Sequence, residues 1–490
     1  MPDPKGFLTF GRALPPSRPV PVRLGDWNDV YLPADDELIR EQATRCMNCG
    51  IPYCHSGCPL GNIIPDFNDF VRTDRWAEAS EVLHATNNFP EFTGRLCPAL
   101  CEASCVLGVG DEPVTIKQVE VEIANRAADR DLIVPQVAEQ RTGQSVAVVG
   151  SGPSGMAAAQ QLARAGHAVT LYERSDAVGG LMRYGIPDFK LEKHLLDTRM
   201  EQLAAEGVSF VTGCEVGVDV TAQELRDRHD AVLLTCGSLA ARDVPATPGR
   251  QLPGIHQAME YLVGANHVVK GALDAPPISA AGRNVIVIGG GDTAADCLGT
   301  AHRQGAASVH LIEMVPQPPK ERDKARHPWP TWPVILRSNS SHDEGGQRIF
   351  GATVKEFVAG PDGRLCAVRL VDVTISMVGG FTVTEVPGTE RELAADLVLL
   401  AVGFTGTEAG PMLDQLGLAR NPRGTIDSDA DWQTGTPGVF VAGDMRRGPS
   451  LVVWAIAEGR SAAAAVHRYL GGRGHLPAPV TPASMPLMAR

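Results

Sequence analysis

The sequence predicts an α/β protein with two Rossmann-like dinucleotide-binding domains behind an N-terminal α-helical, cysteine-rich domain. Two glycine-rich turns, which begin at Gly150 and Gly289, each follow an apolar strand and open a helix. Such units are typical of nucleotide-binding domains built on parallel sheets. Seven of the 11 cysteines fall between Cys46 and Cys105, ahead of both turns. At roughly 150 residues per domain, the 490 residues leave room for all three domains.

Composition and charge exclude several classes of protein. Hydrophobic residues make up 43% and charged residues 21%, as in an ordinary globular chain. No apolar run approaches the length of a transmembrane helix, and the N-terminal segment lacks the apolar stretch of a signal peptide. The net charge of −13 disfavours binding to nucleic acid or to anionic membranes. We therefore expect a cytoplasmic protein.

Residues 1–142 are expected to form the helical domain, with helical spacing over 35–45, 67–89 and 114–130. In a reducing compartment, clustered cysteines indicate metal binding rather than disulfides. Zinc is one alternative, but the closely spaced run that ends in Cys58-Pro59 is similar to a ferredoxin pattern and favours iron–sulfur clusters. Two 4Fe–4S clusters need one ligand more than the seven cysteines supply, so either one ligand is not cysteine or one cluster is smaller. The remaining thiols are expected to be core or turn residues: Cys214, Cys236, Cys297 and Cys366.

The first glycine-rich turn contains Gly150, Gly152 and Gly155. The first glycine permits a tight turn, the second lets a pyrophosphate approach the backbone at the helix N-terminus, and the third lets helix and strand pack closely. Glu173 ends the next strand, where a carboxylate accepts hydrogen bonds from ribose hydroxyls. A glycine-rich turn without a ligand is the alternative.

The second turn begins with Gly289 and Gly291, continues with Asp292 and Thr293, and has its strand-end acid at Glu313. Two further apolar strands are expected within 230–238 and 396–404. Residues 438–470 then predict a strand, a turn at Gly443-Asp444 and a helix that begins near Ser450. The Asp444 carboxylate suits a hydrogen bond to the ribityl chain of a flavin, which assigns the flavin to the first domain. The alternative is that Asp444 serves only as a helix N-cap. The proline-rich segment from Gly471 is expected to be a flexible tail.

This combination has a chemical logic. A nicotinamide delivers two electrons together as a hydride, whereas an iron–sulfur cluster carries one electron at a time, and a flavin converts between the two. The sequence therefore predicts an NAD(P)H-dependent oxidoreductase with nicotinamide, flavin and clusters in series. No catalytic acid–base residue is demanded, and no Ser-His-Asp pattern stands out.

The order of these motifs resembles the family of glutamate synthase small (beta) subunits over nearly the whole chain. The resemblance rests on the cysteine domain, the two glycine-rich turns, residues 179–187 and 439–444, and the proline-rich stretches 316–319 and 328–333. The N-terminal part of dihydropyrimidine dehydrogenase has a similar architecture. The resemblance implies a fold like glutathione and adrenodoxin reductases, with an NAD(P)H domain at 281–409 inserted into an FAD domain at 143–280 and 410–490.

The resemblance also implies a role. NAD(P)H reduces FAD, and electrons pass through two 4Fe–4S clusters to FMN on a large (alpha) subunit. That subunit makes glutamate from glutamine and 2-oxoglutarate, so this chain alone is not expected to make glutamate. The alternatives are a stand-alone NAD(P)H:ferredoxin-type oxidoreductase and a zinc-stabilised FAD scaffold. A disulfide reductase is disfavoured, because neither dinucleotide domain contains a Cys-x-x-Cys motif.

Site residues follow from the same resemblance. One cluster is expected on Cys46, Cys49, Cys54 and Cys105, and the other on Cys58, Cys97, Cys101 and Glu120. A solvated helix glutamate is the alternative for Glu120. The cofactor-binding residues are expected to be Gly150, Gly152, Pro153, Ser154, Gly155, Glu173, Arg174, Gly180, Leu181, Gly237, Gly289, Gly291, Asp292, Thr293, Glu313, Gly443, Asp444, Ser450, Leu451 and Ala455.

The sequence determines the choice between NADH and NADPH less clearly than it determines the other cofactors. NADPH-dependent members of this family usually show paired arginines just past the strand of the second unit, where this chain has Glu313. An acid suits a free 2′-hydroxyl and repels a 2′-phosphate, which favours NADH. Lys320, Arg322 and Lys324 lie nearby in the sequence and offer compensating charge, so NADPH stays open.

Overall fold

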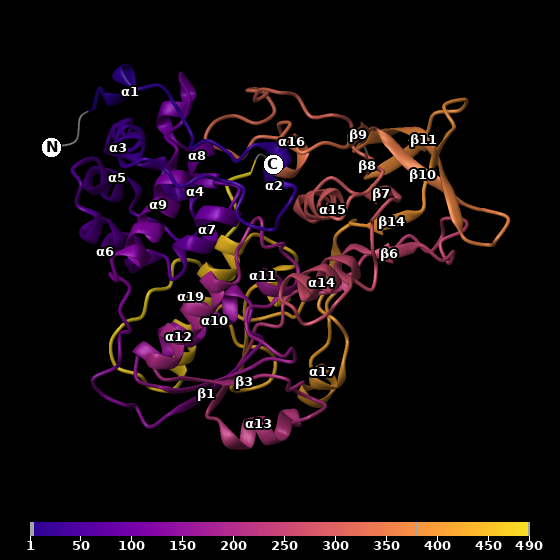
Figure 1. Cartoon of the computed structure of the whole chain (residues 1–490). Helices are drawn as coiled ribbons and strands as arrows, with labels where there is room; N and C mark the ends of the chain where they lie inside the picture. Colours follow the sequence, from indigo (N-terminus) through magenta and orange to yellow (C-terminus); the bar gives the residue numbers. More distant parts are fainter. Residues whose placement is uncertain (1–3, 378–379, 489–490) are drawn as a thin grey trace.

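The computed structural model describes residues 4–377 and 380–488, which fold into three parts. In Figure 1 the N-terminal helices lie at the upper left, a first α/β unit lies below them, and a second α/β unit lies to the right. Within the described ranges, no helix is long and apolar enough to cross a membrane.

The N-terminal part is helical, as the spacing of apolar residues predicts. The expected helix over 67–89 is two helices, because Asp74 adopts a left-handed backbone (φ 63°) that separates α5 from α6. Trp76 and Leu83 of α6 are both buried in the core of this part. The helices are α1 (Gly6–Thr9), α2 (Val20–Arg23), α3 (Asp36–Thr44), α4 (Tyr53–Gly57), α5 (Ile64–Arg72), α6 (Trp76–Thr86), α7 (Pro90–Leu96), α8 (Leu100–Ala103), the 3-10 turn η1 (Val106–Val109) and α9 (Ile116–Asp129).

The first α/β unit is a parallel sheet with strand order β16-β4-β1-β2-β3. Helices α10 and α19 pack together on one face, and α13 and α17 cover the other. Its elements are β1 (Ser145–Val149), α10 (Pro153–Arg164), β2 (Ala168–Tyr172), α11 (Leu181–Tyr184), α12 (His194–Ala205), β3 (Val208–Val211), α13 (Ala222–Arg228), β4 (Ala231–Leu234), α17 (Pro411–Leu416), β16 (Val439–Val441), α18 (Asp444–Arg447) and α19 (Val452–Tyr469).

The second unit is a parallel sheet of order β6-β14-β7-β8-β9, and its chain lies between β4 and β16 of the first. Because β6 already pairs with β14, this unit begins near residue 255, and the boundary expected at 280 is placed too late. Three residues of strand are too short for a sequence pattern to reveal. The elements are β6 (Ile255–Gln257), α14 (Ala258–Val269), β7 (Asn284–Ile288), α15 (Asp292–Arg303), β8 (Ser308–Glu313), α16 (Ser340–Asp343), β9 (Gln347–Phe350) and β14 (Leu397–Leu400).

An antiparallel sheet covers the face of the second sheet opposite α14 and α15. Phe357 and Val368 of this sheet share a core cluster with Ile286 and Val398 of the parallel sheet. The antiparallel strands are β10 (Ala352–Ala359), β11 (Leu365–Ser376), β12 (Thr382–Glu385) and β13 (Arg391–Ala394). A two-stranded pair, β5 (Ala240–Ala241) with β15 (Phe404–Gly406), lies where the chain crosses between the two units.

Buried polar contacts join the N-terminal helices to the first α/β unit. Arg199 of α12 donates from Nε and from a terminal nitrogen to the two carboxylate oxygens of Glu91 in α7, both at 2.7 Å. Their side chains are only 3% and 7% exposed. Arg460 of α19 donates to Asn88 Oδ1 at 2.6 Å, and Asn88 in turn donates to Gln160 of α10 at 2.7 Å. Helix α7 is thereby held against α10, α12 and α19 of the first α/β unit.

The loop 314–339, which connects β8 to α16, reaches from the second unit to the N-terminal helices. Trp329 packs against Tyr53 with ring centroids 4.7 Å apart and ring planes tilted by 58°, and its Nε1 donates to the carbonyl of Cys105 at 3.1 Å. Arg322 donates to the carbonyl of Ala103 at 3.0 Å. One loop therefore bridges two of the three parts of the chain.

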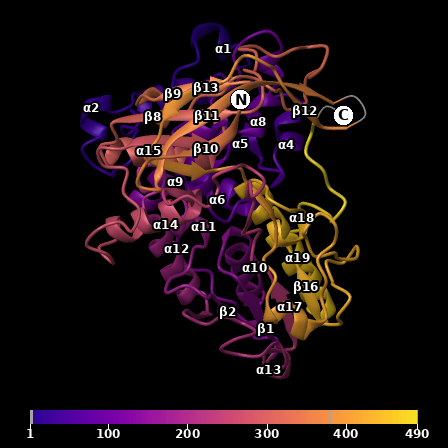
Figure 2. The same cartoon turned by 90° about the vertical axis from the view of Figure 1, so that its right-hand side faces the viewer.

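The C-terminal segment 471–488 packs along the molecule, which differs from the flexible tail that its prolines predict. Val480 is buried, and Gln161 of α10 donates to the carbonyl of Pro477 at 2.9 Å. Trp332 of the 314–339 loop donates its N–H to the carbonyl of Leu487 at 2.7 Å. In Figure 2 this yellow segment runs from α19 up towards α4 and α8. Such contacts between distant segments are not visible in local composition.

The Arg199–Glu91 pair supplies a stability test. Glu91→Ala leaves a buried guanidinium without its carboxylate, which typically costs about 3–5 kcal/mol. We expect a loss of that size in the free energy of unfolding, measured by urea denaturation. The control is Glu392→Ala at the Arg369–Glu392 pair, which is half-exposed and should cost at most about 1 kcal/mol. Equal losses in the two variants would contradict the proposed importance of the buried pair.

Candidate cofactor sites

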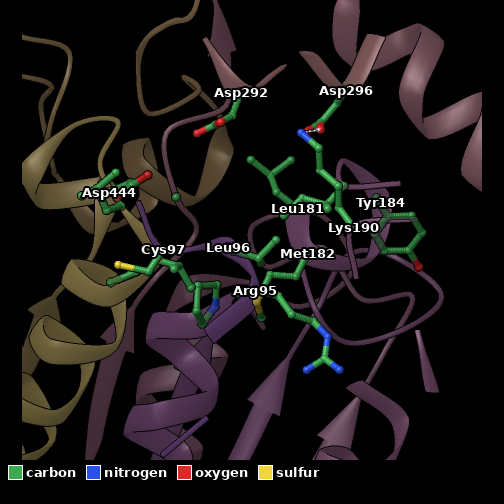
Figure 3. Close-up of a pocket in the computed structure, with 18 of the residues that line it drawn as sticks. Arg95, Leu96, Cys97, Leu181, Met182, Tyr184, Lys190, Asp292, Asp296 and Asp444 are labelled. Atoms are coloured by element: carbon green, nitrogen blue, oxygen red, sulfur yellow. Dashed lines mark ion pairs between the residues drawn. The ribbon is translucent and has the colours of Figure 1, made fainter. Parts of the chain in front are cut away.

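One large cavity, of about 2480 Å³, lies where the three parts of the chain meet. Figure 3 shows Cys97 from the N-terminal part, Leu181 and Asp444 from the first unit, and Asp292 and Asp296 from the second unit around it. The expected cofactor-binding residues that line it are Gly150, Gly152, Pro153, Ser154, Glu173, Arg174, Gly180, Leu181, Gly237, Gly291, Asp292, Thr293, Asp444, Ser450, Leu451 and Ala455. The cavity therefore joins the two glycine-rich turns.

The expected residues that do not line the cavity include three glycines that lie just behind it. An added Cβ on Gly155 would lie 2.0 Å from the carbonyl oxygen of Gly150, and one on Gly289 would lie 2.2 Å from the carbonyl oxygen of Ala401. Gly443 has a φ of +70° and lies against Ser154. These glycines shape the walls of the cavity by close packing rather than by facing a ligand.

The first turn has the geometry that a dinucleotide requires. Gly150 has a φ of +99°, which a side chain would strain, and it packs against the backbone of Thr235. Glu173 accepts hydrogen bonds from the backbone N–H groups of Ser151 at 3.1 Å and Ser175 at 2.8 Å, which hold its carboxylate at the end of β2. Arg174 beside it pairs with Glu408 at 2.8 Å. These residues fit an adenosine ribose and pyrophosphate.

Asp444 provides an independent sign of a ligand in the first unit. Its Oδ2 accepts a hydrogen bond from the Ser450 backbone at 3.2 Å, while its buried Oδ1 has no partner among the described residues. Burial raises the pKa of Asp444 to about 7. A buried oxygen without a partner is costly unless a ligand hydroxyl satisfies it, which fits a ribityl chain.

A residue outside the sequence motifs fixes the position of Asp444. Glu458 of α19 is fully buried and accepts from the Gly443 backbone at 3.0 Å and from Arg447 at 2.7 Å. Arg446 also pairs with Glu458, at 2.8 Å. The sequence analysis did not identify Glu458, because a glutamate in an alanine-rich helix gives no local signal of this contact.

The strand-end acid of the second unit lies behind its glycine-rich turn. Glu313 does not line the cavity, but an added Cβ on Gly290 would lie 2.0 Å from Glu313 Oε2. Gly290 itself lines the cavity. Arg348 of β9 donates to Glu313 Oε1 from Nε at 3.1 Å and from a terminal nitrogen at 2.8 Å. This arginine was not anticipated, because it comes from a strand 35 residues further along the chain.

Lys190 and Asp296 form a second pair that the motifs did not reveal. Lys190 follows α11 of the first unit, and Asp296 belongs to α15 of the second. Both side chains line the cavity, and Figure 3 shows the ion pair between them. Burial raises the pKa of Asp296, while Lys190 favours its charged form. The pair is a direct electrostatic link between the two units at the cavity.

The first set of predicted cluster ligands surrounds one small cavity. Cys46, Cys49, Cys54 and Cys105 all line it, together with apolar residues such as Ile64 and Val114. Burial raises the pKa of the Cys46 thiol to about 12, so an uncompensated thiolate is unfavourable there. A polynuclear metal cluster would supply the compensating charge, and the four-cysteine donor set fits it.

The second set lies at the boundary with the first α/β unit. Cys58 and Cys97 pack against the core cluster that contains Phe89, Phe92 and Met156, and Cys97 lines the large cavity. The pKa of Cys58 is raised to about 12 and that of Cys97 to about 11, mainly by burial and in part by the charge of Glu120. Glu120 is therefore close enough to both thiols for its charge to affect their pKa values.

Glu120 is a buried carboxylate rather than a solvated one. It is 6% exposed, and it accepts hydrogen bonds from Asn87 at 3.2 Å, from Asn62 at 3.3 Å and from Thr93. Burial raises its pKa to about 7. In the described part of the chain, no three Cys, His, Asp or Glu side chains converge closely enough to hold a single metal ion.

Two protein families match the chain. The family described as pyridine nucleotide-disulphide oxidoreductase matches residues 144–459. The family described as dihydropyrimidine dehydrogenase domain II, 4Fe-4S cluster, matches residues 23–132. The second match covers all eight predicted cluster ligands, from Cys46 to Glu120.

Curated relatives match the chain from end to end. The glutamate synthase [NADPH] small chain of Mycobacterium tuberculosis is 56% identical, over 99% of this chain and 100% of that protein. The glutamate synthase [NADPH] small chain of Bacillus subtilis is 43% identical, over 97% and 100%. The glutamate synthase [NADH] of Saccharomyces cerevisiae is 42% identical over 96% of this chain, which corresponds to 23% of the yeast protein.

A solved structure shares the fold of the two α/β units. FprA of Mycobacterium tuberculosis, in complex with NADPH, superposes with a TM-score of 0.52 at 22% identity. The match covers 67% of this chain and 85% of FprA. This likeness supports the mixed α/β architecture in which one nucleotide-binding unit is inserted into another.

Glu120 can be tested by substitution. If Glu120 is a ligand of one of two clusters, as the sequence predicts, Glu120→Ala should release that cluster and lower the iron content by about half. Glu120→Gln should keep most of the iron, because an amide oxygen remains at the position and the buried charge is removed. Iron and acid-labile sulfide per chain are the measurement, with Gln118→Ala on the same helix as the control. Full iron content and an unchanged EPR spectrum in Glu120→Ala would remove Glu120 from the ligand set.

Asp444 links pH to stability. Because its folded pKa of about 7 lies above the ordinary aspartate value, the proton is held more tightly in the folded chain. Its contribution to stability is therefore present at low pH and is lost as the pH rises through about 7. We expect Asp444→Asn to raise the unfolding midpoint of the flavin-free chain by a few degrees near pH 8 and less near pH 5. The same variant should retain less FAD.

The control for Asp444 is Asp362→Asn, at an exposed loop position. That variant should change neither the midpoint nor the flavin content. Equal shifts in Asp444→Asn at both pH values would show that the buried carboxyl does not titrate as described.

Proposed function

The chain belongs to the glutamate synthase small-chain family of NAD(P)H-dependent oxidoreductases, and from that premise we propose that it feeds electrons to a large subunit. It would oxidise NAD(P)H at FAD and pass the electrons through two 4Fe–4S clusters. The large subunit would use them, at its FMN, to make glutamate from glutamine and 2-oxoglutarate. The observation that most strongly supports this proposal is one cavity that joins both glycine-rich turns to Cys97.

The residues would divide the work between two nucleotides. The turn from Gly150 to Gly155, together with Glu173 and Asp444, would hold FAD, and the turn from Gly289 to Thr293 would hold NAD(P)H. Bound flavin supplies the conversion between hydride transfer and single-electron transfer. The N-terminus of α19, next to Ser450, would stabilise negative charge on the reduced flavin.

The two cysteine sets would act in a fixed order. Cys97 lines the nucleotide cavity, and Cys58 packs on the core of the flavin-side unit, so the Cys58–Cys97–Cys101–Glu120 set would be the proximal cluster. The set with Cys46, Cys49, Cys54 and Cys105 lines a separate cavity within the N-terminal helices. It would be the distal cluster, from which electrons leave for the large subunit.

The absence of a further active site in this scheme has a chemical reason. Hydride and electron transfer between bound cofactors requires positioning rather than an acid–base pair. The chain's own residues would hold the cofactors, exclude water and set the distances. We place this activity in the cytoplasm, in complex with the FMN-bearing large subunit.

The decisive experiment is anaerobic purification of the full chain. We expect about eight iron atoms and an equal amount of sulfide per chain, as two 4Fe–4S clusters require, with about one FAD per chain. The purified chain should oxidise NAD(P)H with ferricyanide as acceptor, yet form glutamate only after the large subunit is added. Zinc in place of iron, or an absence of flavin, would refute the proposal. Full activity with ferredoxin and no complex with the large subunit would favour the stand-alone oxidoreductase.

A further inference from the structure

The turn that carries Asp444 is short and lies between two glycines. Helix α18 has only four residues, and it is flanked by Gly443 with a φ of +70° and Gly448 with a φ of +87°. Glycine adopts such conformations without strain, but it also leaves the backbone free to change them. Asp444 lines the nucleotide cavity together with Ser450. The position of its carboxylate therefore depends on contacts from outside the turn.

Two arginines of α18 share the buried carboxylate of Glu458. Arg446 donates to Glu458 from Nε at 3.2 Å and from a terminal nitrogen at 2.8 Å. Arg447 donates to the same carboxylate from Nε at 2.7 Å. One carboxylate thus faces two guanidinium groups, each of which has further N–H donors that need acceptors.

The C-terminal segment supplies those acceptors, and we call its residues 477–488 the C-terminal strap. A terminal nitrogen of Arg446 donates to the carbonyl of Pro482 at 3.0 Å, and one of Arg447 donates to the carbonyl of Ser484 at 2.9 Å. A turn within the strap sets the spacing of these carbonyls, because the Ser484 N–H donates to the carbonyl of Thr481 at 2.9 Å. Both arginines therefore bridge Glu458 and the strap by charge-assisted hydrogen bonds.

Contacts on both sides of the arginines hold the strap in place. On one side Val480 is buried, and its N–H donates to the Ser461 hydroxyl of α19 at 3.1 Å. On the other side the carbonyl of Leu487 accepts from the Trp332 N–H of the 314–339 loop at 2.7 Å. In Figure 2 the strap belongs to the yellow segment that runs from α19 towards α4 and α8. The arginine contacts thus lie between two anchors in different parts of the chain.

Resting on the proposed function, we infer that Arg446, Arg447 and the C-terminal strap are positioning elements for the flavin. They hold α18 from the side of Glu458, so that the Asp444 carboxylate stays where the ribityl chain of FAD needs it. Burial is the main cause of the raised pKa of Asp444, and the charges of Glu458 and Arg447 act on that pKa in opposite directions. The arginine–glutamate set is therefore close enough to Asp444 to influence it directly.

The coupling between strap and flavin has to act in both directions. If the docked strap strengthens FAD binding by some factor, bound FAD must favour the docked strap by the same factor. Hydrogen exchange of the wild-type chain, with and without FAD, measures this coupling. We expect FAD to slow the exchange of the Val480 N–H and of its neighbours in the strap about tenfold, the scale of one hydrogen bond to a charged group.

Helix α13, on the surface of the same unit, is the reference for this measurement. Its exchange should change less than about threefold when FAD binds, because its residues make none of the contacts that join the strap to Asp444. Strap exchange that stays the same in a chain that binds FAD would overturn the inference.

Substitution of an arginine tests the link from the protein side. Arg447→Lys keeps a positive charge beside Glu458 but loses the planar fork that reaches both the carboxylate and the strap. We expect the Kd for FAD to rise about tenfold or more, measured by the fluorescence of free flavin. The matched control is Arg468→Lys on α19, at an exposed pair with Asp431, and it should leave the Kd within about twofold. Equal Kd values in the two variants would contradict the role of the arginine.

Deletion of residues 481–490 removes the acceptor carbonyls and leaves the arginines and Glu458 in place. The shortened chain should release FAD about tenfold faster or more, while its iron and sulfide content stays at the wild-type level. Wild-type release of FAD would overturn the inference. A parallel loss of iron would show a general role of the strap in folding and would likewise contradict a role directed at the flavin.

These outcomes are distinguishable from a failure of the proposed function. A wild-type chain without affinity for FAD would refute the proposed function and, with it, the role of the strap. Normal FAD binding in the wild type, in Arg447→Lys and in the shortened chain would refute the role of the strap alone.

Discussion

The position of α7 is the constraint on which the rest of the arrangement depends. The Arg199–Glu91 pair and the contacts of Asn88 hold this helix against α10, α12 and α19, and Cys97 follows directly at its C-terminal end. The side chain of Cys97 therefore reaches the wall of the nucleotide cavity. A charge pair in the interior contributes little net stability compared with apolar packing, but it defines one relative placement of two domains. Under the proposed function, that placement would determine the distance over which electrons move between the cofactors.

Much of this architecture is encoded locally. The sequence reveals the two strand–turn–helix units, the helices around the cysteines and the glycine positions. Each of these produces a pattern within a few consecutive residues, either a glycine where φ is positive or a periodic spacing of apolar residues. The elements that the sequence analysis did not predict lack such a local pattern. Strand β6 has three residues, and strands β10 to β13 alternate only weakly between buried and exposed positions. Glu458 and Arg348 act through partners that the fold brings together from distant segments.

The two nucleotide-binding units show how one motif serves two purposes. Both have a glycine with positive φ at the first position of the turn and an acid at the end of the second strand. In the first unit the acid is held by backbone N–H groups, so its charge faces whatever binds beside it. In the second unit an arginine from the next strand shares that charge. The same motif therefore has different charged neighbours in the two units, because Arg348 comes from another element of the fold.

The 314–339 loop has a mechanical consequence. The second unit is joined to the first by two crossings of the chain, near β5 and β15, which would otherwise act as a hinge. Trp329, Arg322 and Trp332 fasten the far side of that unit to Cys105, Ala103 and Leu487. Any swing about the hinge would have to break these hydrogen bonds or deform the 314–339 loop, and one of the bonds ends on the backbone of Cys105. The second unit is therefore held at both ends, and its motion is mechanically coupled to the backbone at Cys105.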